Sequence, residues 1–114
     1  MAKKALVIYY SYGILIVYVC RIANETDFIA SGARIAAEIG ADIIKAFYCK
    51  DFEKVTCNCP VPVILAGGPK DADITAVVRE VVSKGAKGLA FGRNLFQAED
   101  IKGLVRDLDA ALRG

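Results

Sequence analysis

Four short apolar runs, none of which alternates apolar with polar residues, constrain the fold more than any other feature. They occupy residues 5–10, 41–48, 61–66 and 88–91, and glycine, proline or charged residues bound each of them. A strand with one face in water alternates apolar and polar side chains, whereas a strand covered on both faces does not. We therefore expect a parallel β-sheet that is covered on both faces.

Apolar residues at helical spacing fill most of the intervals between these runs. Three such segments are residues 26–39, which end at Gly40, residues 74–82, which are opened by Asp71 or Asp73, and residues 99–112, which begin with two acidic residues. Capping residues of these types favour helix ends at these points. Residues 51–55 leave room for no more than a turn or two. The expected order is a strand followed by a helix, repeated four times.

The length of the chain limits how many such units it can contain. A chain of 114 residues corresponds to one domain, since a domain takes roughly 100–200 residues. Alternating strands and helices form either an open sheet or part of a TIM barrel. A complete eight-unit barrel takes about 250 residues. We expect an α/β fold, a parallel sheet of four βα units that is half of a TIM (βα)8 barrel, with residues 1–114 as a single domain.

The absence of histidine restricts the chemistry that this chain can perform. Ser-His-Asp and Cys-His pairs and every His-ligated metal site are excluded, so Lys, Tyr, Cys, Asp or Glu must supply any reactive group. The formal net charge is +2, and no basic cluster is longer than Lys3-Lys4. This charge distribution does not favour a nucleic-acid partner. We expect no cofactor.

The four cysteines have a spacing that does not match a zinc site. The four are Cys20, Cys49, Cys57 and Cys59, and the last two are separated by one residue, whereas zinc sites usually have a gap of two. We expect reduced structural thiols and no metal, with metal or redox use as the alternative.

The apolar segment 5–20 is the one stretch that resembles a membrane segment. It has 16 residues, short of the roughly 18–20 that a spanning helix needs, and tyrosine, serine and glycine interrupt it. We expect a cytoplasmic protein for which a membrane is an improbable partner, and a membrane-anchored fragment is the alternative.

Two successive predicted strands end in glycine. Gly67 and Gly68 follow the third run, and Gly92 and Arg93 follow the fourth. Glycine lets backbone N–H groups approach an anion, and a guanidinium binds phosphate through two hydrogen bonds. TIM barrels bind phosphate after their last two strands. We predict that these four residues bind phosphate, and ordinary turns are the alternative.

Lys45 lies inside the apolar run 41–48. Desolvation lowers the pKa of an ammonium and frees the amine to attack a carbonyl carbon, which is the basis of Schiff-base catalysis. The residues alone leave a structural lysine, paired with Asp42 or Asp51 or reaching solvent, equally open. Tyr10, which ends the first run, is the candidate proton-transfer group, and packing of the clustered tyrosines is its alternative.

Three strings carry a resemblance to a known family. They are residues 40–45 (GADIIK), 61–70 (VPVILAGGPK) and 85–97 (GAKGLAFGRNLFQ). In this order they resemble the archaeal-type class I fructose-bisphosphate aldolases, which belong to the wider DeoC/LacD-like aldolases and include aminodideoxy-heptulosonate synthase. The resemblance covers about three quarters of the chain and implies the C-terminal half of an aldolase barrel. It implies that Lys45 is the Schiff-base lysine and that Gly67, Gly68, Gly92 and Arg93 bind the substrate phosphate.

The chain departs from the family pattern at its beginning. Family members have Tyr-Pro-Arg-Gly at the end of the fifth barrel strand, and its tyrosine is the acid–base group. Residues 10–13 read Tyr-Ser-Tyr-Gly, so Tyr10 matches and the proline and arginine do not. The first four βα units are absent, together with the first-strand aspartate that assists proton transfer.

The resemblance implies an aldolase-like protein that acts on or binds a ketose phosphate, such as fructose 1,6-bisphosphate, through an imine on Lys45. The alternative is a non-catalytic half-barrel that binds a phosphosugar or forms oligomers. A four-unit sheet on its own exposes an apolar face and two open edges. We therefore expect self-association into a homodimer or larger assembly, with residues 14–19 in the contact surface.

Overall fold

The computed structural model describes residues 6–11, 13–19, 26–68 and 73–114, and for residues 6–11, 18, 19 and 94 it describes the backbone alone. The elements in chain order are β1 (Leu6–Ser11), β2 (Ile14–Val19), α1 (Thr26–Glu38), β3 (Ile43–Ala46), α2 (Glu53–Cys57), β4 (Val63–Leu65), α3 (Ile74–Ser83), β5 (Gly88–Leu89), α4 (Arg93–Phe96) and α5 (Ile101–Arg113). The strands form one sheet in the order β1-β2-β3-β4-β5. β2 to β5 are parallel neighbours, which confirms the predicted α/β fold with four parallel strands.

The first parallel strand is β2, so the prediction that residues 5–10 form it was wrong. That run forms β1, which pairs antiparallel with β2 from Leu6↔Val19 to Ser11↔Ile14. Gly13 has a φ of 77°, a left-handed conformation that glycine adopts without strain in a hairpin turn. Two apolar runs separated by two residues that include glycine indicate a hairpin, and this signal was missed.

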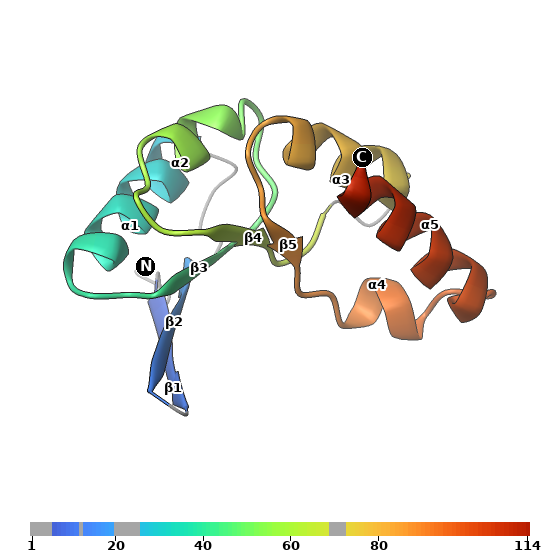
Figure 1. Cartoon of the computed structure of the whole chain (residues 1–114), viewed down its shortest axis with the longest axis horizontal. Helices are drawn as coiled ribbons and strands as arrows, with labels where there is room; N and C mark the ends of the chain where they lie inside the picture. The colour runs from blue at the N-terminus through green and yellow to red at the C-terminus, as the bar shows by residue number, and fades with distance from the viewer. Residues whose placement is uncertain (1–5, 12, 20–25, 69–72) are drawn as a thin grey trace, which may run out of the picture.

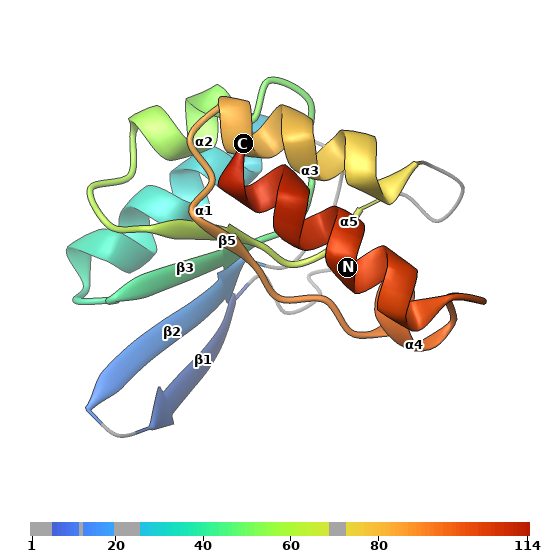
Figure 2. The same cartoon turned by 45° about the vertical axis from the view of Figure 1, so that its right-hand side comes forward.

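The helices α1, α2 and α3 lie on one side of the sheet, and the β1–β2 hairpin projects away from them (Figures 1 and 2). Along β3, Ile44 and Ala46 are buried, whereas Ile43 and Lys45 are partly exposed. Buried residues of β4 alternate with the partly exposed Ile64 in the same way. The expectation of a sheet covered on both faces was therefore wrong. The uncovered face is nevertheless apolar, as is the interior face of strands in a complete TIM barrel.

The core lies between the covered face of the sheet and the helices. Its largest fully buried side chains are Phe52, Ile29, Ile44, Leu65, Val17, Val55, Val63, Val78 and Val81. Val17 belongs to β2, which lies between β1 and β3 in the sheet. Val17 faces the core, whereas Ile14 of the same strand is 45% exposed, so a contact surface at residues 14–19 stays a prediction.

Aspartate side chains cap the two longer C-terminal helices. The Asp73 carboxylate accepts hydrogen bonds from the N–H groups of Thr75 and Ala76, and Asp100 accepts one from Gly103. A capping carboxylate satisfies N–H groups that have no partner within the helix. Asp73 is thus the residue of the two candidates that opens α3, and α5 begins at Ile101, after Glu99 and Asp100, rather than with these two residues in its first turn. No helix in the described ranges is long and apolar enough to cross a membrane.

Candidate functional site

The carboxyl ends of β3, β4 and β5 form one continuous edge of the sheet. Backbone hydrogen bonds extend past the strand ends, from Ala66 N to Ala46 O at 2.7 Å, and from Ala90 N to Leu65 O at 2.8 Å. The residues that directly follow these three strands therefore lie next to one another at this edge of the sheet. In parallel α/β folds this edge is where functional groups gather.

Lys45 lies on the uncovered face of β3, near this edge. It is partly exposed, and its register partners are Tyr18 on β2 and Ile64 on β4. Gly67 lies three residues beyond Ile64, which corresponds to about 10 Å along a strand.

The predicted glycine loop after β4 lies against the beginning of α3. Gly67 is buried, and its carbonyl oxygen accepts a hydrogen bond from Tyr48 N at 3.1 Å. A Cβ atom added at Gly68 would lie 3.0 Å from Ile74 Cδ1 and 3.5 Å from Val77 Cγ1. A side chain at position 68 would therefore require the end of the Ile74 side chain to move by a few tenths of an ångström.

The second predicted glycine lies at the same edge, after β5. Gly92 is exposed and immediately precedes α4, of which the exposed Arg93 is the first residue. Within the described part of the chain, no ion pair involves Arg93. The structure thus places Lys45 and the four predicted phosphate ligands along one edge of the sheet.

Tyr10 is not part of this arrangement. It pairs with Leu15 near the beginning of β2, because β1 runs in the opposite direction to the other strands. Lys45 pairs with Tyr18, three residues further along β2, which places Tyr10 about 10 Å away along the strand direction and two strands across. The structure therefore does not bring Tyr10 beside Lys45, and Tyr18 occupies the adjacent register position. The hairpin glycine Gly13 was the sequence signal that could have identified Tyr18 as the neighbour of Lys45.

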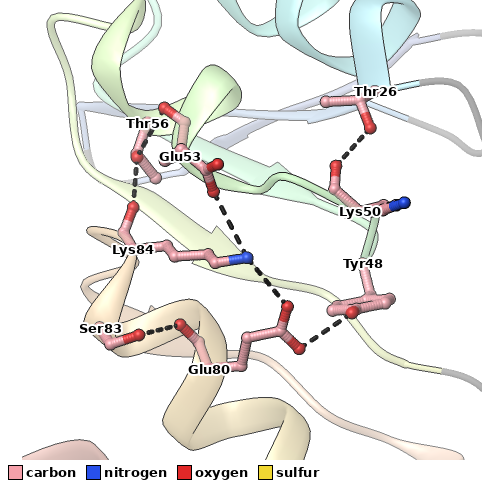
Figure 3. Close-up of polar contacts among 8 residues, drawn as sticks. All are labelled: Thr26, Tyr48, Lys50, Glu53, Thr56, Glu80, Ser83 and Lys84. Carbon is pink, nitrogen blue, oxygen red and sulfur yellow. Dashed lines mark hydrogen bonds and ion pairs between the residues drawn. The ribbon is translucent and has the colours of Figure 1, made fainter.

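A polar cluster, which the sequence did not reveal, connects the segment after β3 with α2 and α3 (Figure 3). The Tyr48 hydroxyl donates to Glu80 Oε2 at 2.9 Å, and Lys84 Nζ lies 3.1 Å from Glu80 Oε1 and 3.5 Å from Glu53 Oε2. Burial, and secondly the hydrogen bond to Glu80, raises the pKa of the Tyr48 hydroxyl above its ordinary value. The hydroxyl therefore remains a donor throughout the neutral pH range.

The described cysteines are free thiols. Cys49 is buried, Cys59 is partly exposed and Cys57 is exposed, while Cys20 lies outside the described residues. Burial raises the pKa of the Cys49 thiol, which keeps it protonated and unreactive at neutral pH. Among the residues whose positions are described, no group of three or more Cys, Asp or Glu could hold a metal ion.

Comparison with known proteins gives one family. The sequence model described as DeoC/LacD family aldolase matches residues 13–98. The match begins at the Gly13 turn and leaves out β1, in agreement with β2 as the first parallel strand of the fold. The 3-hydroxy-5-phosphonooxypentane-2,4-dione thiolase of Salmonella paratyphi A is 37% identical over 93 residues, which are 79% of this chain and 32% of that protein.

Two solved structures have the same fold. An archaeal fructose 1,6-bisphosphate aldolase matches 85% of this chain and 44% of its own, with a TM-score of 0.75 and 32% identity. An archaeal fructose-1,6-bisphosphate aldolase whose catalytic lysine is covalently bound to the carbinolamine intermediate matches 82% of this chain and 41% of its own, with a TM-score of 0.71 and 33% identity. The chain therefore spans about a third of the curated relative and less than half of each solved chain.

Proposed function

Because the chain belongs to the DeoC/LacD family of aldolases, we propose that it forms an imine between Lys45 and a ketose phosphate. The observation that carries the proposal is the placement of Lys45 on the uncovered sheet face, below two glycine loops at the same edge. A substrate with a carbonyl group and a phosphate group requires an amine for the carbonyl and, close to it, an anion-binding site for the phosphate. The covalent lysine intermediate of a solved relative supports the same chemistry.

The proposed reaction begins when Lys45 Nζ attacks the ketose carbonyl carbon. A C–N bond forms, the carbonyl oxygen takes up a proton, and loss of water from the carbinolamine leaves the imine. The protonated imine nitrogen then withdraws electrons from the adjacent carbon, which allows the neighbouring C–C bond to break or a C–H proton to leave. Backbone N–H groups of the loops at Gly67, Gly68 and Gly92, with Arg93, hold the phosphate and so orient the carbonyl toward the amine.

Borohydride trapping tests this function directly. The chain is incubated with dihydroxyacetone phosphate, reduced with borohydride and analysed by intact mass and peptide mapping. We expect one stable adduct on the peptide that contains Lys45, since reduction converts an imine into a secondary amine. Absence of any adduct at saturating substrate contradicts the proposal.

Tyr18, rather than Tyr10, is the proposed proton-transfer residue. Its register position beside Lys45 on the adjacent strand supports this role. We expect Tyr18→Phe to retain the trapped adduct but to slow exchange of the substrate's C–H proton with deuterated water by about a hundredfold, a typical contribution of general acid–base catalysis. Tyr10→Phe is the matched control and should exchange at the rate of the unaltered chain. Slower exchange in Tyr10→Phe but not in Tyr18→Phe would show instead that Tyr10 is the proton-transfer residue.

A non-catalytic phosphosugar-binding domain is the second candidate function. It is favoured by one observation, namely that Tyr10, the expected proton-transfer residue, is not beside Lys45 in the sheet. Catalysis depends on reacting groups that are held rigidly next to one another, whereas phosphate binding at the glycine loops does not need Tyr10. Phosphate binding without a trapped adduct would identify this function instead.

We propose that the chain self-associates and that this contact covers the two ends of the helical layer. Ile35 on α1 is 54% exposed and Ile39, just beyond the end of α1, is 60% exposed, and at the other end of the layer Phe96 on α4 is 75% exposed. A second copy related by a two-fold axis would bring the α1 surface of each chain against the α4–α5 end of the other. Exposed apolar patches of this kind commonly mark contact surfaces.

Light scattering at micromolar concentration is expected to give a mass of at least twice 12.2 kDa. Replacing both Ile35 and Ile39 by glutamate should reduce that mass to one chain, because two charges would have to be buried in the contact. The control, Lys50→Glu, changes an exposed position in the loop that follows β3 and should leave the mass unchanged. A single-chain mass for the unaltered protein overturns the proposal.

A further inference from the structure

Tyr48 lies two residues beyond the end of β3 and contacts two further parts of the site. It lies three residues beyond Lys45, its backbone N–H donates to the carbonyl of Gly67 at 3.1 Å, and its hydroxyl donates to Glu80 Oε2 at 2.9 Å. Gly67 belongs to the proposed phosphate loop, and Glu80 belongs to α3, the helix that follows this loop. One residue therefore connects the strand of the proposed nucleophile with both the loop and the helix.

Glu80 is itself held in a fixed position. Its second carboxylate oxygen accepts from Lys84 Nζ at 3.1 Å, and the same ammonium reaches Glu53 Oε2 on α2 at 3.5 Å. The Thr56 hydroxyl of α2 also donates to the Lys84 carbonyl oxygen at 2.5 Å. Figure 3 shows these contacts joining α2, α3 and the segment after β3. A hydrogen bond to a carboxylate that is held in this way is stronger than one between neutral groups.

The position of α3 determines the position of the loop. Gly68 lies so close to α3 that an added Cβ would meet Ile74 Cδ1 at 3.0 Å. Glu80 lies six residues further along the same helix, about 9 Å at the helical rise. Because a helix this short moves as a rigid unit, a shift of α3 at Glu80 would be transmitted to Gly68.

From these contacts we infer that Tyr48 and Glu80 are positioning residues that set the distance between the Lys45 amine and the phosphate loop. The inference rests on the proposed imine chemistry of Lys45, and it adds a requirement that the phosphate and the carbonyl of one substrate be bound at a fixed separation. Neither residue touches the substrate. Their hydrogen bond joins the two elements whose separation the substrate must match.

The test compares two ketones that differ only in the phosphate. The rate of borohydride-trapped imine formation is measured with dihydroxyacetone phosphate and with dihydroxyacetone, for the unaltered chain and for Tyr48→Phe. We expect the ratio of the two rates to fall about tenfold in the variant, since small misplacements of bound groups have effects of this size or larger. A purely structural role would lower both rates together and leave the ratio unchanged, which would overturn the inference.

Two further variants keep the test decisive. Glu80→Gln retains a side-chain oxygen that can accept from Tyr48, so its ratio should lie closer to that of the unaltered chain than the ratio of Glu80→Leu. Glu38→Gln breaks the Arg34–Glu38 ion pair, which has the same four-residue spacing on α1, and should leave the ratio unchanged. If Tyr48→Phe does not fold, the comparison of Glu80→Gln with Glu80→Leu decides.

Hydrogen exchange separates failure of this inference from failure of the proposed function. In Tyr48→Phe the amide of residue 48, bonded to Gly67 O, should exchange about tenfold faster relative to the amide of Ala66, bonded to Ala46 O. If the unaltered chain forms no adduct but this change occurs, the imine proposal fails and the connection between strand, loop and helix stands. If residue 48 exchanges at an unchanged rate, the inference is wrong whatever the trapping result.

Discussion

Replacing Lys45 by methionine is expected to remove the borohydride-trapped adduct completely. Methionine keeps the unbranched apolar stem that packs on the sheet but has no amine, so no imine can form. Lys45 is partly exposed on the uncovered sheet face, and the substitution should therefore leave the fold intact. Intact mass after reduction in the presence of dihydroxyacetone phosphate is the measurement.

Lys87→Met is the matched control for this substitution. Lys87 is exposed and directly precedes β5, at the edge of the sheet opposite to the glycine loops. The control should retain the full adduct. An adduct that persists in Lys45→Met, or that maps to another lysine, would show that a different amine reacts and would remove the basis of the proposed function.

Replacing Phe52 by alanine is expected to lower the free energy of unfolding by about 3–5 kcal/mol, because it leaves a cavity where an aromatic ring was fully enclosed. Phe52 is 0% exposed and is the largest fully buried side chain of the core. Its carbonyl oxygen also accepts the hydrogen bonds that begin α2. The loss is a large part of the roughly 5–15 kcal/mol by which a domain is stable. Urea unfolding followed by circular dichroism measures it.

Phe96→Ala provides the comparison for the core substitution. The same atoms are removed, but Phe96 is 75% exposed, so in a background with Ile35→Glu and Ile39→Glu, in which the chain is expected to be single, the change in unfolding free energy should stay within about 0.5 kcal/mol. Equal losses in the two variants would mean that Phe52 is not enclosed as described. In an assembly of several chains, Phe96→Ala would instead lower the mass measured by light scattering.

The strand–helix order and the edge with the glycine loops were predictable because both depend on residues close together in the chain. Apolar runs, aspartate caps and glycines after strands act over a few residues. Parallel strands joined by helices necessarily bring their carboxyl ends to one edge. For this reason the sequence alone predicts that Lys45 and Gly67, which are distant in the chain, lie at the same edge of the sheet.

The hairpin between β1 and β2 could have been predicted from the sequence, but which of its two strands lies beside β3 could not. Gly13 indicates a turn, yet either of the two flanking apolar runs has the composition of the first parallel strand. Which run lies beside β3 depends on pairing with residues 43–46, more than twenty positions further along the chain. That choice moved the proposed proton-transfer role from Tyr10 to Tyr18.

Short-range patterns of side chains thus specified the class of fold, the strand that carries the proposed nucleophile Lys45, and the glycine loops at the same edge of the sheet. Long-range packing decided which strand borders Lys45, which face of the sheet stays open, and that Tyr48 meets Glu80 across 32 residues of chain. The physical reason is that local preferences are properties of a few neighbouring residues. Contacts between distant segments depend instead on the free energy of the whole packed molecule, in which many alternative pairings compete.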